Sequence, residues 1–383
     1  MLLSKSDTVS ILDAIERIKP GQGETVILFI AENSCPDLDD LVARLNDRGV
    51  SFVGGVFPGI IQGENHLREG ALLKVAATLG APHYLPPSWE KDLDPPVEVL
   101  ELVSARPAGL SLMVLSNGLS SHTAHLLGGL FHLVGLDVNF IGGGAGFGDF
   151  VSRPCLFSPA GVFEDGLLLL PCRSAGPVGV GHGWEPIHGP LLATRTSGNT
   201  VHEFNWQPAA AVYGPLVAQY TGKTPKSENC FDLAKFYPLG MECQGLPHVV
   251  RDPIGCGQDG EMICAGEVEE GTGMYIMASN PELMAGAAAG ALQQCLSGLA
   301  PGAAPASGQE VDLALCAFCC ISRLLVLGDQ FERELKAMNR EAGAGPGALT
   351  LEGPLTIGEI ASNGQGPIQV FNKTVVSGVI HGR

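Results

Sequence analysis

Apolar and polar positions near the start of the chain predict a strand, a helix and two strands (βαββ), in that order. Residues 26–30 are a continuous apolar run, which is typical of a buried strand. Residues 36–46 space their apolar positions as an amphipathic helix does, and their first turn is acidic, as suits a helix N-terminus. Apolar segments over 50–55 and 70–77 predict two further strands.

The same order recurs further along, in a second predicted unit. Its strand, helix and following strands are expected at 110–115, 121–134, 138–143, 155–157 and 166–170. Two pairs of segments share local sequence: VSFVGG over 50–55 matches VNFIGG over 138–143, and EGALL over 69–73 matches DGLLL over 165–169. We interpret this as an internal duplication, with chance recurrence of strand–Gly–Gly patterns as the alternative.

The order appears a third time near the C-terminus, without clear sequence similarity. A strand is predicted over 311–320, a helix over 322–340 and strands over 355–361 and 368–376. We therefore predict an α/β fold of the mixed α+β kind, built from repeated βαββ units with mixed sheets. The remaining segments are predicted as strands and hairpins over 177–204 and 232–279, helices over 208–220 and 281–296, and loops over 300–308 and 341–348.

Composition narrows the class of protein. The chain has 383 residues, 45% of them hydrophobic, enough for about two or three structural units with sizeable cores. Its 22 Lys+Arg against 40 Asp+Glu give a net charge of −18, which argues against nucleic-acid and membrane partners. No apolar run approaches the ~20 residues that span a bilayer, and the N-terminus lacks the apolar core of a signal peptide. We expect a cytoplasmic protein in which most of the 11 cysteines are free and buried.

The common nucleotide and zinc motifs are missing or incomplete. The glycine run over 141–148 is followed by loop-forming residues instead of a helix, and no phosphate-binding G-x-x-x-x-G-K-[ST] motif exists. Cys316 and Cys319 form a C-x-x-C without a second pair at ligand spacing, so we predict core cysteines and no metal site. Cys320 lies where the strand gives way to a helix, and there we expect the helix N-terminus and Arg323 to lower the thiol pKa.

Hydrolase motifs are missing too. The sequence contains no G-x-S-x-G and no H-E-x-x-H. Ser116, Ser120 and Ser121 lie near His122 and His125, but hydroxyl groups at such a position are more often helix caps. An enzyme would need a nucleophile beside an oriented base, and a pair that only the fold brings together leaves no local motif.

Three arginines are candidates for binding an anion. Arg195, Arg251 and Arg323 adjoin apolar strands in a chain poor in positive charge. A buried arginine needs a partner, which is either a carboxylate of the fold, such as Asp252 or Glu359, or an anionic ligand.

A series of short motifs runs through nearly the whole chain and resembles the FIST family. These are two-part sensory domains found in bacterial signalling proteins and in some F-box proteins. The motifs lie at 50–59, 116–119, 142–146, 181–187 and 194–201, then at 237–240, 250–253, 320–323, 358–360 and 371–374.

The resemblance implies an N-terminal domain over 1–206, a C-terminal domain over 207–383, and intracellular sensing of small ligands such as amino acids. Some members of the family resemble haem proteins that sense nitric oxide. If this chain binds haem, His182 is the first choice as ligand, because its flanking glycines allow a flat group to approach. The cofactor is otherwise unknown, and a hydrogen-bonded polar histidine is the alternative.

We expect a stand-alone sensory protein that binds an amino acid or another small carboxylate in an inter-domain cleft. No output domain is fused in this sequence, so we expect the signal to pass to a separate partner protein. A haem-based nitric oxide sensor, a ligand-free interaction scaffold and an unrecognised enzyme are the alternatives, and catalysis is the less favoured one. The predicted ligand-binding residues are Asn117, Gly142, Gly143, Gly144, Arg195, Arg251, Cys320, Arg323, Glu359 and Asn372. Loops at strand ends meet at one sheet edge, so Asn117, Cys320 and the loop after Gly142 should face one cleft.

Overall fold

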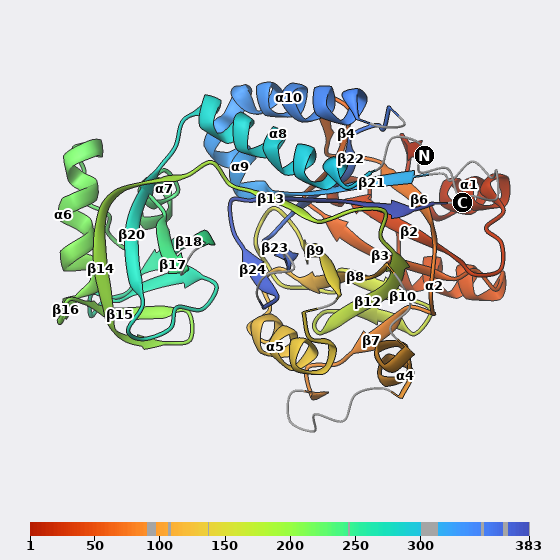
Figure 1. Ribbon diagram of the computed structural model, residues 1–383, viewed down its shortest axis with the longest axis horizontal. Coiled ribbons are helices and arrows are strands. Elements are labelled where there is room, and N and C mark those ends of the chain that lie inside the picture. The colour runs from red at the N-terminus through yellow and green to blue at the C-terminus, as the bar shows by residue number, and fades with distance from the viewer. Residues whose placement is uncertain are drawn as a thin grey trace.

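The chain folds into a body made of three βαββ repeats and a lobe inserted between the second and third (Figure 1). The lobe is residues 185–278, and it lies at one end of the molecule, on the left of the figure. The computed structural model describes residues 1–89, 97–105, 109–136, 138–243, 246–299, 313–345, 348–362 and 367–382.

Repeat 1 has a central strand, β2 (Glu24–Ala31), between two neighbours. It pairs in parallel with β3 (Phe52–Phe57) and antiparallel with β6 (Ala71–Ala77). The connection from β2 to β3 is α2 (Leu38–Asp47), whose first N–H groups are capped by the side chain of Asp37. Two further elements precede the βαββ unit. β1 (Leu2–Leu3) pairs with β6 at the edge of the sheet, and α1 (Thr8–Ile18) packs on the same sheet.

Repeats 2 and 3 follow the same plan. In repeat 2, β8 (Leu110–Asn117) pairs in parallel with β9 (Asn139–Ala145) and antiparallel with β12 (Leu167–Arg173). In repeat 3, β21 (Leu313–Cys320) pairs in the same way with β22 (Glu352–Thr356) and β25 (Val375–His381). The crossover helices are α5 (Thr123–Val134) in repeat 2 and α9 (Ile321–Leu327) with α10 (Phe331–Ala344) in repeat 3.

Each repeat sends a hairpin into the sheet of another repeat. The hairpin of repeat 1 pairs with β22, that of repeat 2 with β3, and that of repeat 3 with β9. The three exchanges close a ring, so no repeat has a complete sheet of its own. The hairpins are β4 (Gly59–Gln62) with β5 (Asn65–Leu67), β10 (Leu156–Ser158) with β11 (Gly161–Phe163), and β23 (Glu359–Ala361) with β24 (Gln369–Phe371).

The strand register confirms the internal duplication expected from the sequence. Leu28 pairs with Gly54 in repeat 1, and Val114 pairs with Gly142 in repeat 2, so VSFVGG and VNFIGG occupy the same place. A Cβ atom added at Gly142 would lie 1.8 Å from the carbonyl oxygen of Val114, and one at Gly353 of repeat 3 would lie 1.8 Å from that of Ala317. Glycine at these positions lets two strand backbones approach closely.

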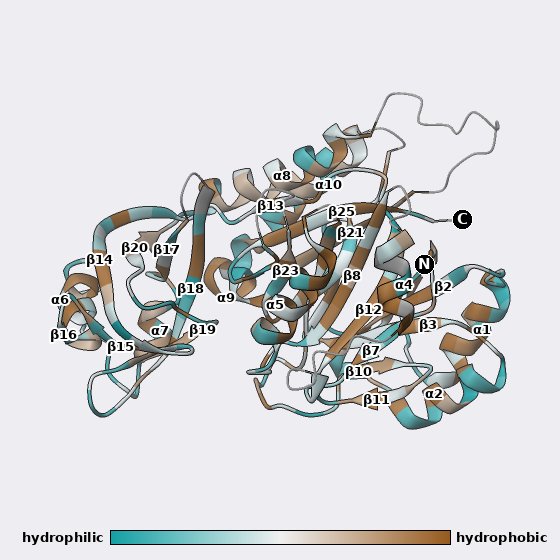
Figure 2. Ribbon diagram, turned by 60° about the horizontal axis from the view of Figure 1, so that its bottom comes forward, coloured by the Kyte–Doolittle hydropathy of each residue, from teal (hydrophilic) through white to brown (hydrophobic). Residues whose placement is uncertain are grey.

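The central strands are apolar on both faces, which explains their uninterrupted runs of apolar residues. One face of each points into a shared core, where the Phe29 ring contacts Phe57 and Phe318 edge-on. The opposite faces pack against helices, and in repeat 3 these include α8 (Pro281–Ser297) and α10. Figure 2 shows the strands of the body largely in the hydrophobic colour, whereas the outer helices α1 and α2 alternate between the two colours.

The last repeat departs from its predicted elements at three turns. The expected single helix over 322–340 is interrupted at Gly328, where φ is 53°, and its second part continues to Ala344 instead of ending in a loop at 341. The expected strand over 355–361 is divided at Gly358, and the one over 368–376 is divided at Lys373, both with positive φ. These two turns begin and end the exchanged hairpin. A local sequence pattern cannot show that this hairpin pairs with a strand of another repeat. The predicted loop over 300–308 lies outside the described residues.

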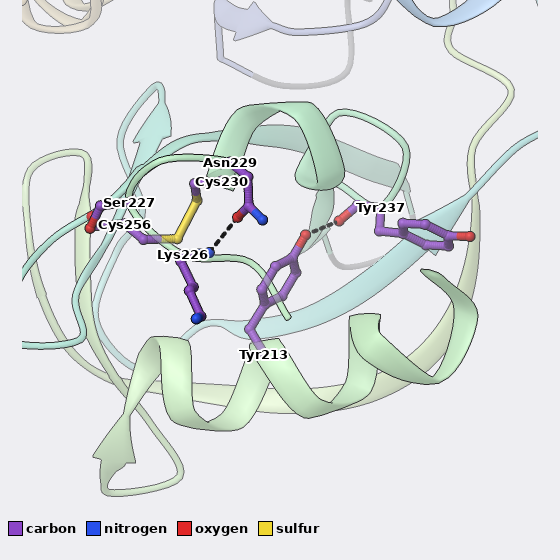
Figure 3. The surroundings of a disulfide bond; sticks show 7 residues. All are labelled: Tyr213, Lys226, Ser227, Asn229, Cys230, Tyr237 and Cys256. Atoms are coloured by element: carbon purple, nitrogen blue, oxygen red, sulfur yellow. Dashed lines mark hydrogen bonds between the residues drawn. A yellow bond between two sulfur atoms is a disulfide. The ribbon is translucent and has the colours of Figure 1, made fainter. Parts of the chain in front are cut away.

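The lobe is an antiparallel sheet with two helices. α6 (Ala209–Thr221) buries Tyr213 against the sheet, and Figure 3 shows Cys230 of α7 (Cys230–Ala234) in a disulfide with Cys256. The other nine cysteines are free and seven of them are buried, as expected from the sequence. The strands are β14 (Glu185–Ser197), β15 (Thr200–Phe204), β16 (Gln207–Pro208), β17 (Leu239–Cys243), β18 (Leu246–Cys256), β19 (Met262–Ala265) and β20 (Gly273–Ala278).

The division predicted between residues 206 and 207 falls in the turn from β15 to β16, inside the lobe sheet. Three of the four sheets combine strands from both sides of this division, for example β23 with β9, and β13 (Gly179–Gly181) with β25. The two predicted domains are therefore intertwined in one structure.

Candidate functional site

A buried triangle of polar side chains lies at the joint, where the lobe contacts repeat 3. Lys373 Nζ lies 2.9 Å from Asp252 Oδ2 and donates a hydrogen bond of 2.7 Å to Ser322 Oγ. Ser322 Oγ in turn donates to Asp252 Oδ2 at 3.0 Å. All three residues are buried, with Lys373 0% and Asp252 4% exposed. Asp252 comes from the lobe, and the other two come from the body, so the triangle spans the joint.

Three separate elements bring the triangle together. Asp252 lies in β18, where it pairs with Ala265 of β19, and Ser322 lies in the first turn of α9. Lys373 lies in the turn between β24 and β25 with φ 55°, a conformation that is strained for a residue with a side chain. The main-chain carbonyl of Lys373 accepts a hydrogen bond from Arg323, which helps to hold this turn in place.

Two buried polar atoms beside the triangle have no hydrogen-bond partner. These are Asp252 Oδ1, a carboxylate acceptor, and Trp184 Nε1, a donor. Lys373 Nζ lies 5.0 Å from the centre of the Trp184 ring, which places the indole next to the triangle. Buried polar atoms in proteins are nearly always paired, so two unpaired atoms in one cluster are an exception.

Burial and the contacts within the triangle act in opposite directions on the pKa of Asp252. Burial raises the pKa of its carboxyl group, while the charge of Lys373 and the hydrogen bonds from Lys373 and Ser322 oppose that rise. A carboxylate held in this way is a stronger base than one on the surface.

Arg323 lies close by, and the fold itself satisfies it. Its side chain is fully buried and forms a two-pronged ion pair with Glu334, with N–O distances of 2.8 and 2.6 Å. Its remaining N–H groups donate to the main-chain carbonyls of His182, Met284 and Lys373. The structural partner is thus Glu334 and not Glu359. These contacts favour a structural role, and the ligand role expected from the sequence stays a prediction.

Glu359 and Cys320 form a second buried polar pair in repeat 3. Thr356 Oγ1 donates to Glu359 at 2.7 Å, and the main-chain N–H of Thr374 donates at 3.2 Å. Burial raises the pKa of Glu359 to about 8. Burial and the nearby Glu359 raise the pKa of Cys320 to about 12. The expectation that Arg323 and a helix N-terminus would lower this thiol pKa is therefore wrong, because desolvation exceeds both effects.

The glycines and Asn117 lie at the same end of the body as Cys320. Asn117 pairs with Ala145 at the end of β9, Gly144 donates its N–H to the carbonyl of Gly358, and Cys320 pairs with Thr356.

The contacts made by these residues join strands to one another. Gly142 and Gly143 pair with Ile360 and Glu359 in the exchanged hairpin. The side chain of Asn117 donates to the carbonyl of Glu164 at 2.6 Å and accepts from the N–H of Leu119 at 2.9 Å. Asn372 is buried, and its Oδ1 is without a partner.

The other two predicted arginines lie in the lobe. Arg195 is exposed and pairs with Glu203 at 3.1 Å on the outer hairpin, away from the joint. Arg251 is buried and donates to the main-chain carbonyls of Glu267, Val250 and Val370, so it ties the lobe to β24.

His182, the candidate haem ligand, lies beside Trp184 and hydrogen-bonds the main chain. Its Nδ1 accepts a hydrogen bond of 2.9 Å from the main-chain N–H of Trp184. Burial, followed by the charge of Arg323, lowers the pKa of His182 to about 4, so the ring is neutral at pH 7. Its role toward haem stays a prediction. Among the described residues, no group of three metal-binding side chains is found.

The sequence reasoning did not assign Lys373, Ser322 or Trp184 to the site, and it named Asp252 only as a partner for an arginine. All four occur within the short motifs at 181–187, 250–253, 320–323 and 371–374. Those motifs were the available signal, but the contacts between them arise only from the three-dimensional fold.

The exchanged βαββ repeats and the inserted lobe define a mixed α/β protein with a buried polar cluster where lobe and body meet. Comparison with protein families agrees with this class. The FIST N domain matches residues 24–207, and the FIST C domain matches residues 209–362. The chain therefore belongs to the FIST family of sensory domains for signal transduction. No curated protein matches it. In the part of the chain that the structure describes, no helix has the length and apolar character needed to cross a membrane.

Proposed function

We propose that this protein senses a small zwitterion, an amino acid or a similar small carboxylate, at the joint between the lobe and repeat 3. The observation that carries the proposal is the pair of unpartnered atoms, Asp252 Oδ1 and Trp184 Nε1, beside the buried charge of Lys373.

The chemistry of these atoms selects the ligand. Asp252 Oδ1 can accept a hydrogen bond from an ammonium group, and Trp184 Nε1 can donate one to a carboxylate. Lys373 and Asp252 already balance each other in charge, and burying a further net charge is costly. A zwitterion adds no net charge and supplies both a donor and an acceptor.

The position of the site suits signalling. Asp252 belongs to the lobe, and Lys373 belongs to the body, so a ligand that contacts both favours one placement of the lobe over others. A separate partner protein that recognises this placement would then carry the signal.

Calorimetric titration of the full chain with amino acids and with small mono- and dicarboxylates tests the proposal. Changing Asp252→Asn removes one charge-assisted contact, which is typically worth about 1.5–3 kcal/mol, so the affinity should fall by roughly 10- to 150-fold. The control is Asp165→Asn, the same substitution at an aspartate of repeat 2. Asp165 pairs with His122 and occupies the equivalent of position 373, so it lies outside the joint. The proposal fails if no compound in the panel binds, or if Asp252→Asn binds as tightly as the unchanged protein.

A further inference from the structure

We propose that Ser322 is a nucleophile and that the triangle hydrolyses small carboxylic esters. This activity uses the joint described above but depends on the contacts of Ser322 itself, and it goes beyond ligand sensing. It brings together a serine and a carboxylate base that no local motif reveals.

The contacts of Ser322 are those that an activated serine requires. Its hydroxyl proton points to Asp252 Oδ2 at 3.0 Å, and its oxygen accepts from Lys373 Nζ at 2.7 Å. Lys373 also contacts that same carboxylate oxygen at 2.9 Å, so it fixes the base relative to the nucleophile. A nucleophile, an adjacent base and a third group that orients the base are the elements of covalent hydrolases.

The surroundings support this assignment. Burial raises the pKa of Asp252, which makes it a better proton acceptor than a surface carboxylate. The ammonium group of Lys373 donates to the oxygen that attacks, so it stabilises that oxygen as its proton passes to Asp252. Trp184 Nε1 is a buried donor with no partner of its own.

The other two repeats provide an internal comparison. The strand register places Glu69 and Asp165 where repeat 3 has Lys373. Repeats 1 and 2 also carry a serine shortly after the central strand. Ser34 accepts from the main-chain N–H of Gly70, and Ser120 accepts from that of His122 and also hydrogen-bonds the carboxyl group of Asp165. Among the described residues, a serine that contacts both a lysine and a carboxylate is found in repeat 3.

The reaction proceeds in two balanced steps. Ser322 Oγ attacks the ester carbonyl carbon, its proton passes to Asp252, and the alcohol leaves with that proton as the carbon–oxygen bond breaks. Water then loses a proton to Asp252 and attacks the acyl-serine, which releases the carboxylic acid and returns the proton to Ser322. The products are one acid and one alcohol from one ester and one water.

The test is acylation of the full chain by p-nitrophenyl acetate. We expect a burst of p-nitrophenol close to one equivalent, followed by slower turnover, with an acetyl group located on Ser322 by peptide mass spectrometry. Ser322→Ala should abolish the burst, whereas the matched control Ser120→Ala should keep it. Lys373→Met and Asp252→Asn should each slow acylation by about 100-fold or more.

Two further measurements separate loss of the nucleophile from loss of the fold. Thermal melting of each variant shows whether it folds, and Ser322→Cys, which retains a nucleophile of similar size, should still acquire an acetyl group at position 322. The proposal is overturned if peptide mapping of the unchanged protein finds acetyl groups on surface lysines but none on Ser322, or if Ser322→Ala keeps the burst.

Failure of this activity and failure of the sensing proposal are separable. If amino acids bind to Ser322→Ala as to the unchanged protein while Ser322 never acylates, sensing stands and hydrolysis fails. If Ser322 acylates while no compound of the calorimetric panel binds, hydrolysis stands and the sensing proposal fails.

Discussion

Repeats 2 and 3 share one backbone plan but differ in chemistry at the end where their strands meet. Asp165 of repeat 2 pairs with His122 at 2.7 Å, and both side chains are partly exposed to solvent. At the equivalent place in repeat 3, Lys373 is fully buried and pairs with Asp252 of the lobe. The difference teaches that the inserted lobe, by supplying a carboxylate, makes a buried lysine tolerable there.

A second position in the exchanged hairpins also carries a titratable residue in repeat 3 and an apolar one in the other two repeats. The strand register places Glu359 of repeat 3 where the other hairpins have Ile60 and Leu156. All three residues are buried, but only the glutamate brings a titratable group into the core. At this position repeat 3 therefore has a titratable residue where its two relatives have residues that serve packing, which is typical of a functional site placed on a repeated scaffold.

The largest effect on stability should come from Arg323→Met. The change leaves the carboxylate of Glu334 buried without its partner, which typically costs about 3–5 kcal/mol. Urea denaturation measures this loss. The control is Arg195→Met in the exposed pair with Glu203, where we expect a change within about 1 kcal/mol. Equal losses in the two variants would contradict the structural role of Arg323.

A smaller effect should come from the glycines that the repeats share. Gly142→Ala and Gly353→Ala each bring a Cβ atom against a carbonyl oxygen of the central strand, and we expect each to lower stability by about 1–3 kcal/mol. Gly128→Ala in α5 is the control. A Cβ atom there meets nothing within 4 Å, so alanine should be neutral or stabilise the helix by up to about 1 kcal/mol. If Gly353→Ala alone were tolerated, the equivalence of repeats 2 and 3 at this position would fail.

An effect that appears only as the pH rises should be a loss of stability specific to repeat 3. The pKa of Glu359 is raised to about 8 in the folded protein from its usual 4.5, so folding favours the protonated form. The resulting stability is present below pH 4.5 and is lost as pH rises through 8. Glu359→Gln keeps the shape but does not titrate. We therefore expect it to match the unchanged protein at pH 5 and to be the more stable of the two at pH 9.

Thermal melting of both proteins across this range measures the difference directly. Taking the difference cancels other titrating groups, such as Asp252, whose pKa is also raised, and His182, whose pKa is lowered. A constant difference between the two proteins from pH 5 to pH 9 would contradict the raised pKa of Glu359.

Local patterns alone determined the repeated elements of this protein. The apolar runs predicted the central strands because both of their faces are buried, and the matched segments at 50–55 and 138–143 predicted the duplication that the strand register confirms. The helices over 208–220 and 281–296 were also predicted within one residue of α6 and α8, because their composition and boundaries are local properties.

The tertiary structure decided the hairpin exchange and the triangle. Lys373 was predicted within a strand, because an apolar sequence does not reveal that the chain turns there to leave one sheet for another. The contacts of Asp252, Ser322 and Lys373 join residues far apart in the sequence, through an inserted lobe. Hydrophobic periodicity reports which residues are buried, but not which buried polar groups meet, since that depends on how the separate elements pack.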